Sequence, residues 1–283
     1  MLSIKFYNET GSITFGGGKS NSPWRITSAE GLAICGKTFN TARFIGQDGQ
    51  ETTSVVGNAR TITISGDITI GENFCAEFSS CLATLDKEGW LEVTSSCGVR
   101  RIHARCCDFV QGERKGKYLI FTVQFICDSP YFEDCDRTEV AVFREIPLLD
   151  KSFAFPGMFS KRISKSGLRY DGNAKTEPIF FIEINEGTEG NNILALYNRT
   201  SGESLKFNYA GVMGECITVD VEKRKIYNAD GENLLKYLAD DSFFDGFHLY
   251  PGVNEIEVIN NNMNTGITVI CRYSNKYSEA VLI

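Results

Sequence analysis

The sequence predicts a mainly β protein of two domains, with one helix in the first. Most apolar residues fall in short runs of strand length, and several runs alternate with polar residues, as half-buried strands do. Clusters of Gly, Asn and Asp separate the runs and are typical of turns. A length of 283 residues favours two modest domains over one large one.

In the first half, residues 61–70 (TITISGDITI) alternate Ile with Thr, Ser or Asp, and 117–127 (KYLIFTVQFIC) form an apolar run. Between them, a helix is expected over 72–85, because apolar side chains recur there every three or four residues. These side chains are Phe74, Phe78, Cys81, Leu82 and Leu85. Residues 87–89 end the helix, and a strand resumes at 90–93.

In the second half, strands are expected at 178–184, 216–221, 253–259 and 266–273. Turn sequences occur at 46–50, 186–192, 228–233 and 260–266, and a weak helical turn is expected at 232–239. The connector 146–157 holds two of the six prolines, Pro147 and Pro156. We therefore expect domains at 1–150 and 151–283.

The charge is net acidic, at −7 overall. Counting Lys and Arg against Asp and Glu gives −4 for residues 1–150 (15 against 19) and −3 for 151–283 (14 against 17). Neither half is expected to bind nucleic acid specifically or an anionic membrane through bulk charge. The longest apolar runs are too short to span a bilayer, and the first residues do not have a signal-peptide pattern. We expect the chain to fold in a cytoplasm.

Ten cysteines are present, and without an export signal we expect them to stay reduced. No CxxC pair occurs, and the adjacent Cys106 and Cys107 have no further ligand at metal spacing. Core packing is the predicted role of most of them. The clearest candidates are Cys75, Cys81, Cys127 and Cys271.

No motif of catalysis or cofactor binding is complete. Residues 16–20 (GGGKS) lack the first glycine of a P-loop and run on towards Pro23, so a loop is expected. No serine lies in a GxSxG elbow, and the two histidines have no motif around them. His103 shares a basic strand face with Arg101 and Arg105, and His248 is expected to be a satisfied loop or core residue.

Several carboxylates could in principle pair for glycoside hydrolysis, but spacing selects no pair among them. They are Glu183, Glu186, Asp240, Asp241 and Asp245. The glycosylation sequons at Asn8 and Asn198 have no meaning without export. We therefore nominate no catalytic, cofactor-binding or metal residue, and we expect no cofactor and no enzymatic activity.

Several segments, taken in order, resemble the distal tail proteins of long-tailed phages and their counterparts in contractile tails and tail-like bacteriocins. In the first half these are 59–70, the helix near 74–85, 89–91, 100–110 and 121–135, in which DSPYFED is the most characteristic piece. In the second half they are 169–173, 178–184, 198–205, 214–233 and 242–258. The set covers most of the chain, and the ten cysteines exceed what we expect of the family.

The resemblance implies a virion structural protein of the tail or baseplate. Residues 1–150 would be a ring-forming β-sandwich with the helix near 72–85, and 151–283 a galectin-like β-sandwich. By similarity, a homo-hexameric ring would join the tail tube protein to the tail hub or tail-tip protein, with the tape measure and receptor-binding proteins as further partners. The particle would assemble in the bacterial cytoplasm. Neither the tail type nor the choice between phage and bacteriocin follows from the sequence.

A galectin-like domain also suggests an alternative, a carbohydrate-binding module that attaches to host cell-surface glycan. Both tryptophans, Trp24 and Trp90, lie in the first half, so a sugar site in the second would depend on other aromatic residues. The candidates are Tyr209, Tyr227 and Tyr250, although core or hairpin roles are also expected of them. A tail-associated hydrolase is a third reading, which the missing motifs disfavour.

Overall fold

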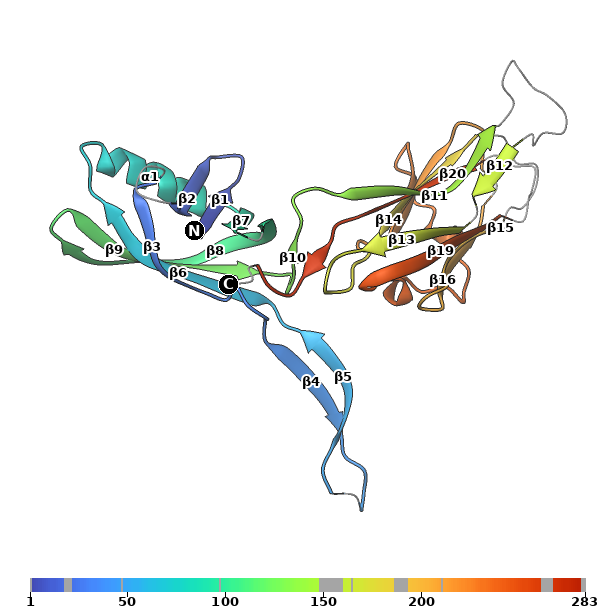
Figure 1. The fold of residues 1–283 in the computed structure, drawn as a ribbon, viewed down its shortest axis with the longest axis horizontal. Helices are drawn as coiled ribbons and strands as arrows, with labels where there is room; N and C mark the ends of the chain where they lie inside the picture. Colours follow the sequence, from blue (N-terminus) through green and yellow to red (C-terminus); the bar gives the residue numbers. More distant parts are fainter. Residues whose placement is uncertain are drawn as a thin grey trace. The chain divides into compact units, whose positions relative to one another are not determined.

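A computed structural model describes residues 2–17, 22–46, 48–96, 98–147, 160–163, 165–185, 193–209, 211–260 and 267–280 (Figure 1). The chain forms two compact units, the first of Met1–Cys135 with Tyr277–Ile283 and the second of Asp136–Lys276. We expected domains at 1–150 and 151–283. The division in the structure differs because the strand β11 (Thr138–Pro147) pairs with β20 (Ile267–Tyr273) in the second unit, and because the chain returns to the first unit at Tyr277.

One sheet of nine strands forms most of the first unit, in the order β21-β10-β8-β7-β1-β2-β3-β6-β9. Because β8 also pairs with β9, the strands from β8 round to β9 close on themselves. The strands are β1 (Ser3–Tyr7), β2 (Ser12–Gly16), β3 (Trp24–Glu30), β6 (Arg60–Thr69), β7 (Gly89–Ser95), β8 (Gly98–Lys115), β9 (Tyr118–Cys127), β10 (Phe132–Glu133) and β21 (Lys276–Tyr277).

The prediction of a mainly β chain is confirmed, but the first unit is a closed, barrel-like sheet rather than an open sandwich. Alternate side chains of its strands point into the enclosed core, where Phe6, Phe15, Phe121 and Phe125 are fully buried. The predicted strands at 61–70 and 117–127 correspond to β6 and β9.

The helix expected over 72–85 is α1 (Phe74–Leu85), and its end and the following strand β7 are also as predicted. The rings of Phe74 and Phe78 stack, and Phe78 also stacks on Trp24 of β3. Leu85 is buried, whereas Leu82 is exposed. The face of α1 that packs on the barrel is therefore narrower than the spacing of the apolar residues predicts. The helix thus covers one end of the barrel core.

The second unit consists of two antiparallel sheets packed face to face, as predicted for a β-sandwich. The larger sheet has the order β12-β11-β20-β14-β17-β18, and the smaller β13-β19-β15-β16. Besides β11 and β20, the strands are β12 (Ser160–Ile163), β13 (Lys165–Tyr170), β14 (Ile179–Ile184), β15 (Ile193–Asn198), β16 (Glu203–Asn208), β17 (Cys216–Asp220), β18 (Lys225–Asn228) and β19 (Gly252–Asn260).

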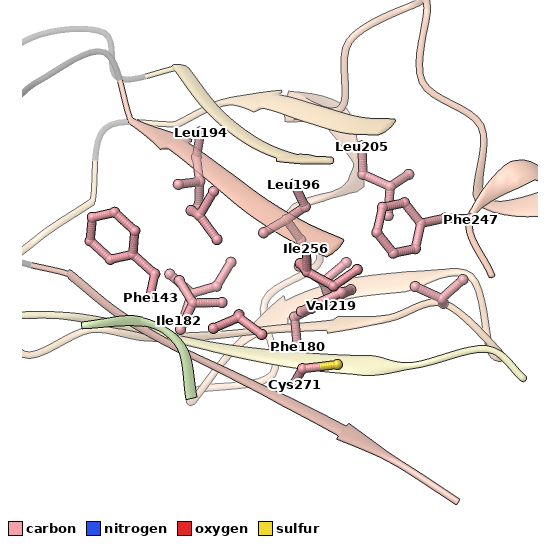
Figure 2. Close-up of a cluster of buried hydrophobic side chains, with 14 of the residues drawn as sticks. Phe143, Phe180, Ile182, Leu194, Leu196, Leu205, Val219, Phe247, Ile256 and Cys271 are labelled. Carbon is pink, nitrogen blue, oxygen red and sulfur yellow. The ribbon is translucent and has the colours of Figure 1, made fainter. Parts of the chain in front are cut away.

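Figure 2 shows the core between these sheets. Leu196 and Ile256 of the smaller sheet face Phe180, Val219 and Cys271 of the larger one, and all five are almost completely buried. The predicted strands at 178–184, 216–221, 253–259 and 266–273 are β14, β17, β19 and β20. The turn expected at 232–239 is the 3₁₀ helix η1 (Leu235–Tyr237), and a second, η2, spans Phe244–Gly246.

The cysteines follow the prediction only in part. Cys127 and Cys271 are buried, but Cys75 is exposed on α1 and Cys81 is half-buried, so the expected packing role of Cys75 is wrong. Apart from Cys135, the cysteines that the structure describes are free thiols, and Cys97 lies outside the described residues. Most of the predicted connector, from 148 to 157, also lies outside them.

Candidate functional site

A two-stranded arm projects from the closed sheet of the first unit (Figure 1). It consists of β4 (Lys37–Ala42), β5 (Glu51–Gly57) and the turn between them. The two strands pair with each other and form a separate sheet, with a register shift at Asn40. An isolated hairpin of this kind is at best marginally stable in water, so this arm is suited to gain stability from a partner.

The arm exposes an unusual amount of apolar surface. Phe39 on β4 is 60% exposed and lies across from Val55, which is also exposed. At the turn, Phe44 is 55% exposed and Ile45 has no cover at all. Contiguous exposed apolar side chains mark interaction surfaces in soluble proteins. We regard the arm as the candidate interaction surface of this protein.

The root of the arm, residues 31–36 and 57–60, is by contrast rigidly built. Gly31 has a φ of +81°, and a side chain there would lie 2.0 Å from the carbonyl oxygen of Thr61. The amide of Asn58 donates to the Gly36 carbonyl at 3.0 Å, which joins the two sides of the root. Arg60, only 2% exposed, begins β6 directly after the arm. The exposed ribbon therefore starts from a fixed base.

The turn at 46–50 was predicted from the sequence, but the strands beside it were not. The signal was present, because TFNT and TTSVV flank a Gly-rich turn and are rich in β-branched and aromatic residues. Strand runs that carry apolar residues on both faces do not show the alternation used to find the other strands. Exposure of Phe39 and Phe44 could not be read from the sequence, because apolar residues are expected inside.

The basic strand face of β8 lies as predicted. Ile102 and Ala104 point into the barrel core, while His103 and Arg105 are exposed. Arg105 forms an ion pair with Asp128 at 2.6 Å. The ring of His103 meets Trp90 edge to face, with centroids 5.3 Å apart. This face is thus an outer surface, on which Arg101 pairs with Glu133 and Arg105 with Asp128.

His248 differs from its prediction, since it is buried but not satisfied. Its Nε2 atom lies 3.1 Å from Nζ of Lys175 and 3.4 Å from Oε1 of Glu177. Its Nδ1 atom is buried and has no hydrogen-bond partner among the described residues, and the Glu203 carboxylate lies 3.9 Å away. Hydrogen bonding to Glu177 raises the pKa of His248. The side chains that these distances place around His248 are Lys175, Glu177 and Glu203, and they do not supply a hydroxyl or thiol nucleophile.

The remaining candidates are not brought together. A P-loop requires a helix directly after its glycine-rich loop. Here Gly16 ends β2 and the next described element is the strand β3, which begins at Trp24. Residues 18–21 lie outside the described part. Asp241 pairs with Lys206 and Asp245 with Arg224. Glu183 and Asp240 are exposed, and Glu186 is not among the described residues.

The three tyrosines considered for sugar binding lie apart in the fold. Tyr209 packs against the sandwich core, and its hydroxyl donates to Glu215 at 2.7 Å. Tyr227 and Tyr250 are each 37% exposed, on β18 and after η2. Within the described residues, no cluster of three or more His, Cys, Asp or Glu could hold a metal ion, and no helix is long and apolar enough to cross a membrane.

Residues 171–277 match the family model described as the C-terminal domain of the siphovirus-type tail component. No curated protein matches the chain. The crystal structure of SPP1 Dit (gp 19.1), described as a paradigm of the hub adsorption apparatus in phages that infect Gram-positive bacteria, has the same fold. It aligns with a TM-score of 0.67 at 13% identity over 98% of this chain and 99% of that chain. A phage P2 baseplate structure in its activated, Ca-bound conformation aligns with a TM-score of 0.46 at 12% identity, over 96% and 97%.

Proposed function

We propose that the chain forms the distal tail, or baseplate hub, ring of a phage particle, because residues 171–277 match the family model of the C-terminal domain of the siphovirus-type tail component. The proposed assembly is a homo-hexamer that joins the tail tube to the tail hub or tip, with tape measure and receptor-binding proteins nearby. The fold shared with SPP1 Dit along almost the whole chain supports this role, since that protein is described as a hub. We propose a role in assembly rather than catalysis, with assembly in the bacterial cytoplasm.

The arm is the observation that carries the proposal. A hub ring needs each subunit to contact its neighbours, and the arm offers exposed Phe39, Phe44 and Ile45 on a ribbon that reaches out from the first unit. Burying three such side chains would supply several kcal/mol at about 2 kcal/mol each. A closed ring of copies covers every arm once, so no apolar patch is left over. The partner that we assign to the arm is therefore a second copy of this chain.

The experiment compares two pairs of exposed apolar residues, each pair made of two neighbours in the sequence. One variant carries Phe44→Ser and Ile45→Ser at the arm. The matched control carries Val212→Ser and Met213→Ser, another exposed apolar pair, in the second unit. Light scattering and negative-stain imaging of the full chain should show six-fold rings for the wild type and the control, and smaller species for the arm variant.

Two results would contradict the proposal. A wild-type chain that stays monomeric and also fails to bind purified tail tubes would remove the hub role. Rings of equal mass in both variants would leave the hub role intact but remove the arm from the subunit contact. Glycan attachment by residues 151–283 stays a prediction, tested by retention of the full chain on host cell walls.

A further inference from the structure

The chain's last described residues form a segment, Tyr277–Ala280, that lies against the root of the arm. The amide of Ala280 donates to the carbonyl of Leu32 at 2.8 Å, and the Ala280 side chain is buried in the barrel core. The carbonyl of Ser278 accepts a hydrogen bond of 2.6 Å from Nη2 of Arg60. Two of the four residues therefore bond directly to the residues that carry the arm.

Arg60 joins this segment to the rest of the root. Its Nη1 atom donates to the carbonyls of Gly31, at 2.6 Å, and Ala33. Its Nε and Nη2 atoms donate to the Pro130 carbonyl, at 3.1 and 2.7 Å. With the bond to Ser278, all five N–H donors of the guanidinium are used. None of these acceptors is a carboxylate, so the buried charge depends on the complete set of carbonyls.

The far side of the segment is held by Arg100 of β8. Its Nη1 atom donates to the backbone carbonyl of Glu279 at 2.7 Å and to the Glu279 side chain at 3.0 Å. Its guanidinium also lies over the ring of Tyr277, 3.6 Å from the centroid. The hydroxyl of Tyr277 donates to Asp134 at 3.2 Å. The segment is thus bound like a peptide, with contacts at each of its four residues.

We infer that the C-terminal segment is an internal ligand that fixes the root of the arm, and that the arm becomes competent for ring assembly only when this segment has docked. A guanidinium is a rigid planar fork, so it positions its acceptors jointly. Without the docked segment, one buried N–H of Arg60 loses the Ser278 carbonyl and the carbonyl of Leu32 loses the Ala280 amide, so the hold on Gly31 and Ala33 weakens.

The order of the arm and the segment along the chain determines which of them is synthesised first. The arm is synthesised early, at residues 37–57, but the segment follows the whole of the second unit, Asp136–Lys276. Because synthesis runs from the N-terminus, the arm root stays incomplete until both units are made. Incomplete chains would then not enter rings. This last step rests on the proposed function, whereas the docking of the segment on the root does not.

Hydrogen exchange of the full chain tests the inference, read by mass spectrometry at residues 31–36 and 58. The variant Arg100→Ala loosens the segment from the side away from the root, so any effect on the root passes through the segment. The matched control is Arg101→Ala on the same strand. Arg101 also forms a 3.0 Å ion pair, with Glu133, and lies over a ring, that of Trp90. The two arginine side chains are almost equally buried, at 18% and 19% exposed.

We expect exchange at the arm root to be about tenfold faster in Arg100→Ala than in Arg101→Ala, with β6 and β9 unchanged in both. Ala280→Asp, which places a charge where the segment is buried, should act in the same direction. Equal root exchange in Arg100→Ala and Arg101→Ala would overturn the inference, even if Ala280→Asp unfolds the unit. Faster root exchange in a chain whose wild type forms no ring and binds no purified tail tubes would keep the docking and reject the hub role.

Discussion

The rings of Trp24 and Phe121 meet edge to face inside the barrel, with centroids 4.9 Å apart and planes at 82°. Trp24 begins β3 and Phe121 lies in β9, and β6 runs between these strands in the sheet. The contact therefore connects strands that share no backbone hydrogen bonds. It lies at the centre of an aromatic cluster that also includes Phe15, Phe78 and Phe109.

Replacing Phe121 with Ala should lower the free energy of unfolding of the first unit by about 3–5 kcal/mol, the usual cost of a cavity of this size in a core. Urea unfolding followed by tryptophan fluorescence measures this, because Trp24 and Trp90 both report on the first unit. Val253→Ala, at an exposed site, should leave the transition unchanged. A loss below about 1 kcal/mol in Phe121→Ala would show that the cluster does not hold the barrel together.

His248 should make the stability of the second unit depend on pH. The neighbouring Glu177 and Glu203 raise its pKa above the ordinary 6.5, and Lys175 opposes them. A raised pKa means that the contribution is fully present below pH 6.5 and is lost as the pH rises through the raised value. The expected loss is on the order of 1 kcal/mol for each unit by which the pKa is raised.

The variant His248→Gln should flatten this dependence, measured as the free energy of unfolding at a series of pH values from about 5.5, one unit below the ordinary pKa of 6.5, to the alkaline end of the transition. His103→Gln, on the exposed face of β8, is the matched control and should keep the wild-type slope. A second effect lies at acid pH, where the hydrogen bond with His248 and the charge of Lys276 lower the pKa of Glu177 to about 2 against the opposing effect of burial. Its contribution should disappear only as the pH falls from about 4.5 towards 2.

Gly66 of β6 should not tolerate a side chain. A Cβ atom there would lie 1.8 Å from the carbonyl oxygen of Arg25, where a register shift at Ile26 brings β3 close. Gly66→Ala should therefore cost about 3 kcal/mol or more, since backbone must move. Gly71→Ala is the control, because its Cβ would meet nothing within 4 Å. Equal melting temperatures for the two variants would mean that the backbone of β3 moves away from residue 66 without loss of stability.

The free thiols should fall into two groups by reactivity. Cys75, Cys107 and Cys216 are exposed and should react with N-ethylmaleimide in the native protein. Cys127 and Cys271 should react only after denaturation, because both are fully buried and burial raises the pKa of Cys127 to about 12. Peptide mapping by mass spectrometry distinguishes the sites. Native labelling of Cys127 would indicate that the barrel opens on the labelling timescale.

The helix and the strands with one buried face could be predicted from the sequence. Burial of one side makes apolar residues recur with a period of two in a strand and of about 3.6 in a helix. Residues 61–70 and 74–85 are clear examples. It did not predict closure of the sheet, which depends on the pairing of β8 with β9 over a long stretch of registered residues. Strand periodicity gives no information about which strands become neighbours.

The candidate site was harder to predict for a related reason. In the part of the chain that the structure describes, the arm has neither a third strand nor a core against which to pack, and local sequence does not record the absence of a neighbour. Arg60 likewise looks like an ordinary strand residue, yet it binds carbonyls from residues 31, 33, 130 and 278. Contacts between positions so far apart in the chain emerge only in the folded protein.

Closure of the barrel also separates the binding of a partner from the geometry of the sheet, whereas in an open sheet the first changes the second. Adding a neighbour to an open sheet extends the hydrogen-bond ladder and changes the twist of the strands next to it. In this unit the inner strands, from β8 round to β9, already have partners on both sides. A copy that joined the proposed ring would therefore keep the barrel interior that it had when alone, because a partner need not rearrange strands that are already paired.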